Sequence, residues 1–226
     1  MQGGEVDRLI SVRQSVTLNG TTGKEGRTMP SDSASLICEM PAPYLIIQAS
    51  WIAFCVYWIW AARNQKRVQK REPPLARLLH VVYMVCGFVL LYTEDPRFGI
   101  LNRRFLPERE WIAMLGAVLA AAGVAFAIWA RRHIGRNWSG QVTIRKEHEL
   151  VRSGPYARIR HPIYTGLLVA LAGTAIAIGE YRAIVGFAVI AVGFIVKAKR
   201  EESFLATQFG PTFDEHRRQT GFFLPR

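Results

Sequence analysis

The chain has 226 residues, enough for one or two domains, and its 29 Lys and Arg residues against 17 Asp and Glu residues give a formal net charge of +12. Half of the residues are hydrophobic, which excludes general disorder. The charge alone would suit a nucleic-acid-binding protein, but the apolar residues stand in blocks between the charges and no nucleic-acid-binding motif is present, so we expect no nucleic-acid partner.

Residues 1–40 are polar, rich in Gly, Ser and Thr, and show no regular hydrophobic period. They also lack the apolar core of a signal peptide. This composition predicts a disordered polar tail. After the tail we expect two regions, residues 41–130 with three membrane helices and residues 131–226 with two more.

Five blocks of the sequence contain no Asp, Glu, Lys or Arg: residues 40–62, 78–93, 111–130, 162–179 and 183–196. A helix that crosses a bilayer needs roughly 17–25 such residues. The second and fifth blocks are short, and basic side chains at their ends can extend them by snorkelling, namely Arg77, Arg182 and Lys197. A short block could instead be a buried helix of a soluble domain. We predict an all-α integral membrane protein with about five transmembrane helices.

Only Glu180, Tyr181 and Arg182 separate the last two blocks, which predicts a tight antiparallel helical hairpin. Small residues recur at four-residue spacing in the third and fourth blocks: Ala113, Ala117, Ala121 and Ala125, then Gly166, Ala170 and Thr174. This spacing would put them on one face of each helix and allow close packing, although alanine richness alone gives the same pattern.

The Lys and Arg residues between the blocks predict the orientation in the membrane. Twenty of them lie in the connections 63–77 and 131–161 or after residue 196, and nine lie on the other predicted side. Basic residues favour the cytosolic side. We therefore expect a multi-pass protein whose C-terminus is cytosolic and whose N-terminus is on the opposite side.

The long connection before residue 162 and the end of the fifth block contain most of the candidate functional residues. Pro162 suits the first position of a helix, which makes His161 the residue before it, and a helix N-terminus is a natural anion site. Such a His-Pro pair is also common as a simple helix start. The turn signal Gly154-Pro155 places Tyr156 upstream of this N-terminus, although a tyrosine there also suits the membrane interface.

Acidic and basic residues follow the fifth block. Lys197 and Glu201 are four residues apart and share a helix face, either as a plain surface pair or as part of a site for a cationic, hydroxylated ligand. Glu202 lies about 100° further round the helix, so we expect only one of the two acids to face a given site.

The sequence predicts no metal site. Four histidines could combine with Glu201 as ligands, but none has HExxH or comparable spacing, and three scattered cysteines do not form a zinc motif: the histidines are His133, His148, His161 and His216. A P-loop, a GxGxxG fingerprint and a serine nucleophile elbow are absent as well.

The motifs together resemble a known family. They are His148-x-Leu150-Val151-x-x-Gly154-Pro155-Tyr156, then Arg160-His161-Pro162-x-Tyr164-x-Gly166, and after an apolar stretch Glu201-Glu202-x-x-Leu205-x-x-x-Phe209-Gly210. In order and spacing they resemble the isoprenylcysteine carboxyl methyltransferase family, whose relatives include membrane phospholipid N-methyltransferases and thiol S-methyltransferases. The resemblance covers about residues 135–225.

The resemblance implies that residues 131–226, including the last two membrane helices, form the catalytic region, whose cytosolic part binds S-adenosyl-L-methionine. The cofactor positions that it implies are Gln141, His148, Glu149, Leu150, Val151, Tyr156, His161, Pro162, Ile163, Tyr164 and Glu201. For catalysis we single out Arg160, Lys197 and Glu201. Lys197 stands where eukaryotic members have an arginine that contacts the substrate, and lysine keeps the charge but loses the bidentate geometry.

The expected reaction transfers a methyl group to a lipophilic or small acceptor, with an isoprenylcysteine-like carboxylate favoured. A phospholipid or thiol methyltransferase is an alternative. So is a sterol-type reductase, in which Arg152, Arg158 and Arg160 could bind the 2′-phosphate of NADPH. A non-catalytic membrane protein is a third alternative. The sequence gives no indication of the acceptor's identity or of the oligomeric state.

Overall fold

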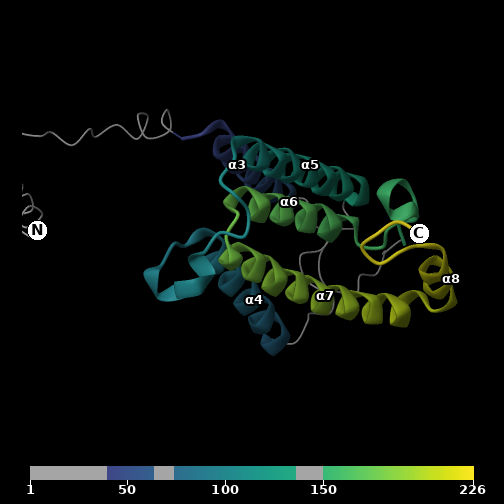
Figure 1. Ribbon diagram of the computed structural model, residues 1–226. Helices are drawn as coiled ribbons and strands as arrows, with labels where there is room; N and C mark the ends of the chain where they lie inside the picture. Colours follow the sequence, from purple (N-terminus) through teal and green to yellow (C-terminus); the bar gives the residue numbers. More distant parts are fainter. Residues whose placement is uncertain (1–39, 64–73, 136–149) are drawn as a thin grey trace, which may run out of the picture. The chain divides into compact units, whose positions relative to one another are not determined.

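The computed structural model describes residues 40–63, 74–135 and 150–226 (Figure 1). Its helices, in chain order, are α3 (Ala42–Ala62), α4 (Pro74–Tyr92), the 3-10 helix η1 (Pro96–Asn102), α5 (Glu110–Ile134), the 3-10 helix η3 (Gly154–Ala157), α6 (Pro162–Ile178), α7 (Tyr181–Phe209) and α8 (Pro211–Gln219). Within these residues no strand forms, and only two isolated β-bridges occur. The all-α prediction is confirmed.

Each of the five charge-free blocks forms a helix. By length and composition α3, α4, α5 and α7 can each cross a membrane, whereas α6 is shorter, with 17 residues. Helix α7 continues well beyond the fifth charge-free block, which ends at residue 196, as far as Phe209. The predicted polar tail, residues 1–40, lies outside the described residues except for Met40, and the division at residue 130 stays a prediction.

Local sequence explains where the helices of the C-terminal half begin and end. Pro162 stands in the first turn of α6, where it has no backbone hydrogen bond to lose. Gly179 ends α6 in the left-handed conformation, with φ of 71°, and α7 begins two residues later. Gly210 ends α7 at a φ of 50°, and Pro211 begins α8. The predicted hairpin is therefore confirmed.

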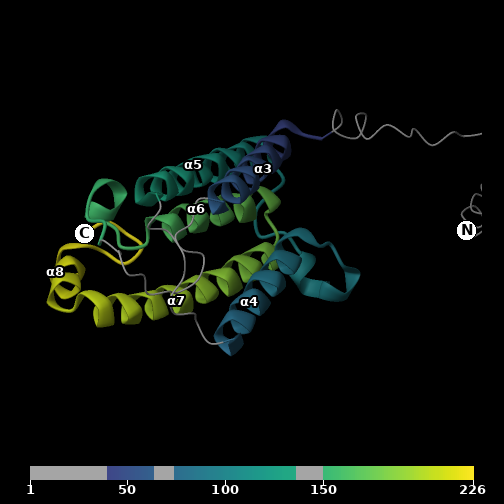
Figure 2. The same ribbon diagram turned by 180° about the vertical axis from the view of Figure 1, so that it is seen from behind.

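Helix α6 lies between α5 and α7, and α4 packs along α7 (Figures 1 and 2). The α5–α6 contact brings the two backbones together at glycines. A Cβ atom added to Gly123 would lie 2.4 Å from the backbone nitrogen of Ala170, and one added to Gly116 would lie 2.5 Å from the carbonyl oxygen of Gly173. Such close approach is typical of small-residue helix contacts in membranes.

The small-residue faces are predicted correctly for α6 and incorrectly for α5. On α6, Gly166, Ala170 and Thr174 are all buried. On α5, Ala117 is buried but Ala125 is exposed, and the face against α6 is formed by Gly116, Ala120, Gly123 and Ala127. Alanine occurs on several faces of this helix, so only the glycines, which permit the closest approach, distinguish the contact face.

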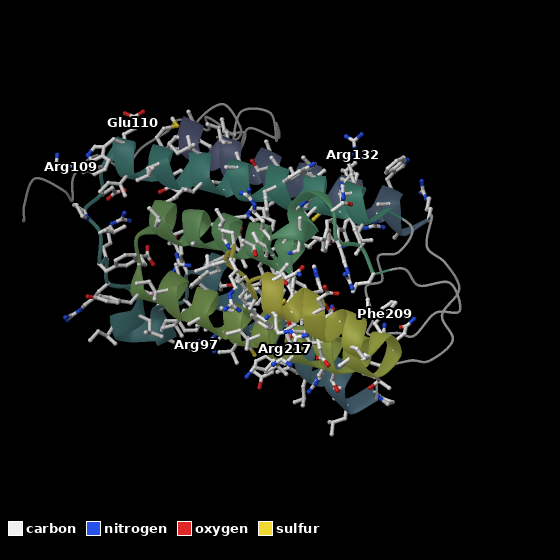
Figure 3. The ribbon with its side chains drawn as sticks, turned by 90° about the vertical axis from the view of Figure 1, so that its right-hand side faces the viewer. Arg97, Arg109, Glu110, Arg132, Phe209 and Arg217 are labelled. Atoms are coloured by element: carbon white, nitrogen blue, oxygen red, sulfur yellow. The ribbon has the colours of Figure 1, made fainter. Side chains whose placement is uncertain are left out.

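Different residues and contacts lie at the two ends of the helices. Arg109 and Glu110 lie at the start of α5, and Arg132 lies near its other end (Figure 3). At the first end Arg182 is buried, donating to the carbonyl of Leu91 at 2.8 Å and to Oε2 of Glu180 at 2.6 Å. The snorkelling expected for Arg182 is therefore wrong, because these internal acceptors satisfy its guanidinium. The chain's C-terminus lies at the second end, beside the start of α6.

Candidate functional site

The residues that enter α6 are held by the end of the chain. Ile159 and Gly221 form a parallel bridge. The backbone N–H of Arg160 donates to the carbonyl of Gly221 at 2.9 Å, and that of His161 donates to the carbonyl of Phe222 at 3.3 Å. These bonds tie the residues just before Pro162 to the C-terminal segment.

His161 lies between two carboxylates of α7. Its Nδ1 is 3.6 Å from Oε2 of Glu201, and its Nε2 is 3.3 Å from Oε1 of Glu202. The residue is buried. Burial alone would lower the pKa of His161, but the hydrogen bonds and charges of Glu201 and Glu202 outweigh it and raise the pKa above its usual value. Each ring nitrogen therefore faces a carboxylate oxygen, an arrangement that favours the charged imidazolium.

Glu201 also accepts a hydrogen bond from Tyr164. The tyrosine hydroxyl donates to Oε1 of Glu201 at 2.5 Å, so the carboxylate joins α6 to α7. The Tyr164 ring stacks on Phe194 with centroids 5.0 Å apart, and Nζ of Lys197 lies 5.9 Å from the same ring. A carboxylate, a phenol and aromatic rings thus meet where the two helices face each other.

Arg160 is engaged within the protein. Its Nε donates to Oε1 of Glu202 at 2.5 Å, and its Nη1 donates to the carbonyl oxygens of Arg217, at 3.1 Å, and Thr220. The guanidinium also lies over the Phe222 ring, 5.7 Å from the centroid. With all of these contacts, Arg160 connects α7 and the C-terminal segment to the start of α6.

The expectation that only one of the two acids faces the site is wrong. Glu201 and Glu202 do lie on different sides of α7, but the imidazole of His161 reaches both because its two nitrogens point in different directions. Sequence reasoning also missed Phe194 and the aromatic pair Phe222-Phe223 at the chain's end. The only sequence signal for that pair was that two adjacent aromatic residues stand in an otherwise polar C-terminal segment.

Tyr156 lies in η3 and is buried in the core that contains Ile163 and Phe194. Its ring stacks near that of His133, with centroids 6.4 Å apart. Burial, followed by the negative charge of Glu201, raises the pKa of Tyr156, so its hydroxyl stays protonated. Tyr156 is therefore close enough to Glu201 to be influenced by its charge.

The remaining predicted positions divide into two groups. Pro162 and Ile163 are buried in α6, and Leu150 and Val151 are half-buried at the start of the described segment 150–226. Gln141, His148 and Glu149 lie outside the described residues. Within the described ranges, no three His, Cys, Asp or Glu side chains are placed to hold a metal ion.

Comparison with known proteins finds a family model that matches the segment containing this site. Residues 114–207 match the model of the isoprenylcysteine carboxyl methyltransferase (ICMT) family. The resemblance seen in the motifs is thereby confirmed, because the matching segment contains the start of α6 and the acids of α7.

The similar proteins include metal-resistance proteins and protein-S-isoprenylcysteine O-methyltransferases. The cobalt-zinc-cadmium resistance protein CzcN of Cupriavidus metallidurans is 34% identical over 53% of this chain and 53% of its own length. Protein-S-isoprenylcysteine O-methyltransferase B of Arabidopsis thaliana is 28% identical over 53% of this chain and 62% of its own. A solved structure of the eukaryotic intramembrane Ras methyltransferase ICMT aligns with a TM-score of 0.45 and 24% identity, over 69% of this chain and 54% of that one. The chain thus spans about half the length of the first two curated relatives it matches.

Proposed function

We propose that this ICMT-related chain is a membrane methyltransferase that transfers a methyl group from S-adenosyl-L-methionine to a lipophilic acceptor. The observation that carries the proposal is the cluster of the buried His161 with the partly buried Glu201 and Tyr164, within the segment that matches the family model. A cluster of this kind at the start of a membrane helix is costly to bury, which favours a functional role over a purely structural one.

The chemistry of the side chains fits the proposed cofactor. S-adenosyl-L-methionine has a sulfonium, an ammonium, two ribose hydroxyls and an adenine ring. Carboxylates complement the cations and accept from the hydroxyls, and the faces of aromatic rings attract cations and stack on purines. Glu201 supplies a carboxylate, and Tyr164 supplies a ring in contact with it. Phe194 packs on Tyr164, and Phe222 packs on His161.

We assign binding roles to the residues that the resemblance implies. Those within the described ranges are Leu150, Val151, Tyr156, His161, Pro162, Ile163, Tyr164 and Glu201, and those outside are Gln141, His148 and Glu149. When bound, the cofactor supplies an electrophilic methyl group. Arg160 neutralises Glu202, so Glu201 is the acid with the freer carboxylate, restrained by Tyr164 and His161.

The protein's contribution to the reaction is chiefly positioning. A cation at Lys197 and a fixed carboxylate at Glu201, one helical turn apart, orient an acceptor and the cofactor on the same face of α7. Holding two reactants in a near-attack arrangement can supply roughly 7–11 kcal/mol of the barrier reduction. A carboxylate acceptor is already ionised at neutral pH and needs no base, whereas a thiol or amine does.

We also propose that the site faces the cytosol, where S-adenosyl-L-methionine is made. The support is the distribution of basic residues, since the predicted cytosolic connections and C-terminal segment contain twenty of the 29 Lys and Arg residues. The start of α6, the end of α7 and the C-terminus share this end of the helices.

A binding measurement separates this function from the reductase and from a non-catalytic protein. The full chain, purified in detergent, is titrated calorimetrically with S-adenosyl-L-methionine and, separately, with NADPH. We expect saturable binding of S-adenosyl-L-methionine and none of NADPH. Binding of NADPH alone would indicate the reductase, and binding of neither would contradict the proposed function.

A further inference from the structure

The contact between α4 and α7 has a regular antiparallel register. A Cβ atom added to Gly87 of α4 would lie 2.3 Å from the Ile190 side chain of α7, and one added to Gly193 would lie 3.0 Å from Met84. Further along, Nη1 of Arg200 donates to the carbonyl of Ala76 at 3.2 Å. From one contact to the next, the residue number falls along α4 and rises along α7, as in an antiparallel pair of helices.

This register brings His80 of α4 opposite Lys197 of α7, because both lie between the Met84–Gly193 contact and the Ala76–Arg200 contact. The His80 ring contacts Phe194, one turn before Lys197, with centroids 6.4 Å apart. The charges that act on the imidazole are those of Lys197, Glu201 and Arg200. His80 therefore faces α7 beside the proposed cofactor site.

The imidazole of His80 has an unsatisfied hydrogen-bonding atom. Its Nδ1 is buried and has no hydrogen-bond partner among the described residues. An unpaired buried polar atom is costly, and few occur in native proteins. A ligand that pairs with this nitrogen would remove the cost, and the positive charge of Lys197 across the contact favours a ligand that is anionic.

We propose that His80 is a further specificity-determining residue, which binds the carboxylate of the methyl acceptor beside Lys197; this inference rests on the proposed function. The imidazole N–H donates to one carboxylate oxygen, and the Lys197 ammonium attracts the charge. Lys197 lies over the Tyr164 ring, and the Tyr164 hydroxyl contacts Glu201, so the carboxylate site adjoins the cofactor site.

The surroundings of His80 suit a lipophilic acceptor. Its sequence neighbours Leu79 and Val81 are apolar and largely exposed, as expected of side chains that face lipid. An isoprenyl chain could therefore lie along α4 in the membrane while the carboxylate reaches His80. The family match begins at residue 114, so α4 lies outside it, and no motif in the sequence indicated His80.

The test compares an acid with its neutral analogue. N-acetyl-S-farnesylcysteine and its carboxamide are titrated into the purified full chain without S-adenosyl-L-methionine, with tryptophan fluorescence as the readout. We expect the wild type to bind the acid more tightly than the carboxamide. His80→Phe keeps the ring but removes the donor, and should weaken acid binding by about tenfold while leaving carboxamide binding unchanged.

Two further variants make the test specific. His80→Asn retains a donor and should recover part of the preference for the acid. Arg77→Gln removes an exposed positive charge from the same end of α4 and should leave the preference intact. Equal binding of acid and carboxamide by the wild type, an unchanged preference in His80→Phe, or no binding of either probe would overturn the inference. S-adenosyl-L-methionine binding, measured separately, reports on the proposed function alone.

Discussion

The imidazole of His161 connects two consecutive acids of α7, and each acid has a second partner of a different kind. Glu202 is paired with Arg160, whose guanidinium also contacts the C-terminal carbonyls, whereas Glu201 is paired with the neutral hydroxyl of Tyr164. The two acids therefore differ in what a ligand can displace. A ligand hydroxyl or cation can replace a neutral phenol at Glu201 far more cheaply than a guanidinium at Glu202.

This difference predicts separate effects of two substitutions. Glu201→Gln should lower the affinity for S-adenosyl-L-methionine by about ten- to a hundredfold, because a charge-assisted hydrogen bond contributes about 1.5–3 kcal/mol. Glu202→Gln should chiefly lower the unfolding temperature, because it leaves the buried Arg160 without its countercharge. Calorimetry and thermal unfolding of both variants measure the two effects. Equal affinities for wild type and Glu201→Gln would remove Glu201 from the binding site.

The raised pKa of His161 predicts a pH-dependent stability. The folded protein holds the imidazolium more tightly than the unfolded chain does, so this stabilisation is fully present below pH 6.5, the ordinary pKa of an imidazole. It is lost as the pH rises through the higher pKa of the folded state. The unfolding temperature should therefore fall as the pH rises from 6.5 through the raised pKa of His161 in the folded protein. His161→Gln should show a flatter profile there, and identical profiles would contradict the assignment.

At the scale of the helices, the charge-free blocks were enough to predict which segments are helical, because a membrane helix satisfies its own backbone hydrogen bonds and needs only apolar length. The contact faces were less predictable. Gly166 and Ala170 marked the α6 face, but the α5 face depends on Gly116 and Gly123, which the alanine pattern did not single out.

The α5–α6 contact can be tested at Gly123. Glycine-to-alanine changes in a helix interior usually stabilise it by about 0.5–1 kcal/mol. Here the added methyl group would meet the backbone of Gly166 and Ala170, so Gly123→Ala should instead destabilise the protein by about 1–3 kcal/mol. Thermal unfolding in detergent measures this effect. The matched control Ala125→Val lies on the exposed side of α5 and should cause little change.

The candidate site was predictable only in part, and the reason is its assembly from distant segments. His161, Tyr164 and Glu201 belong to motifs with fixed spacing, so the resemblance indicated them. The contributions of Glu202, Arg160 and Phe222 depend on how the C-terminal segment packs beside the start of α6. The spacing of residues in the sequence does not predict this packing. His80 depends likewise on the α4–α7 register.

For the whole molecule, the helix order predicts that Arg109 and Arg218 lie on opposite sides of the membrane. Arg109 immediately precedes α5, Arg218 lies in α8, and the helices α5, α6 and α7 separate them in the chain. Single cysteines at these exposed positions, in a chain whose three native cysteines are replaced, should differ in labelling by an impermeant thiol reagent. In intact cells Arg109→Cys should be labelled and Arg218→Cys protected. The reverse pattern would invert the proposed orientation.

Methyl transfer itself tests the central claim most directly. Membranes that contain the wild-type chain are incubated with S-adenosyl-L-methionine labelled in its methyl group and with N-acetyl-S-farnesylcysteine, and the label in the extracted lipophilic fraction is counted. We predict label in that fraction, base-labile as expected of a methyl ester, and its loss with Glu201→Gln. Absence of label from every lipophilic product, or transfer that is unchanged by Glu201→Gln, would contradict the account.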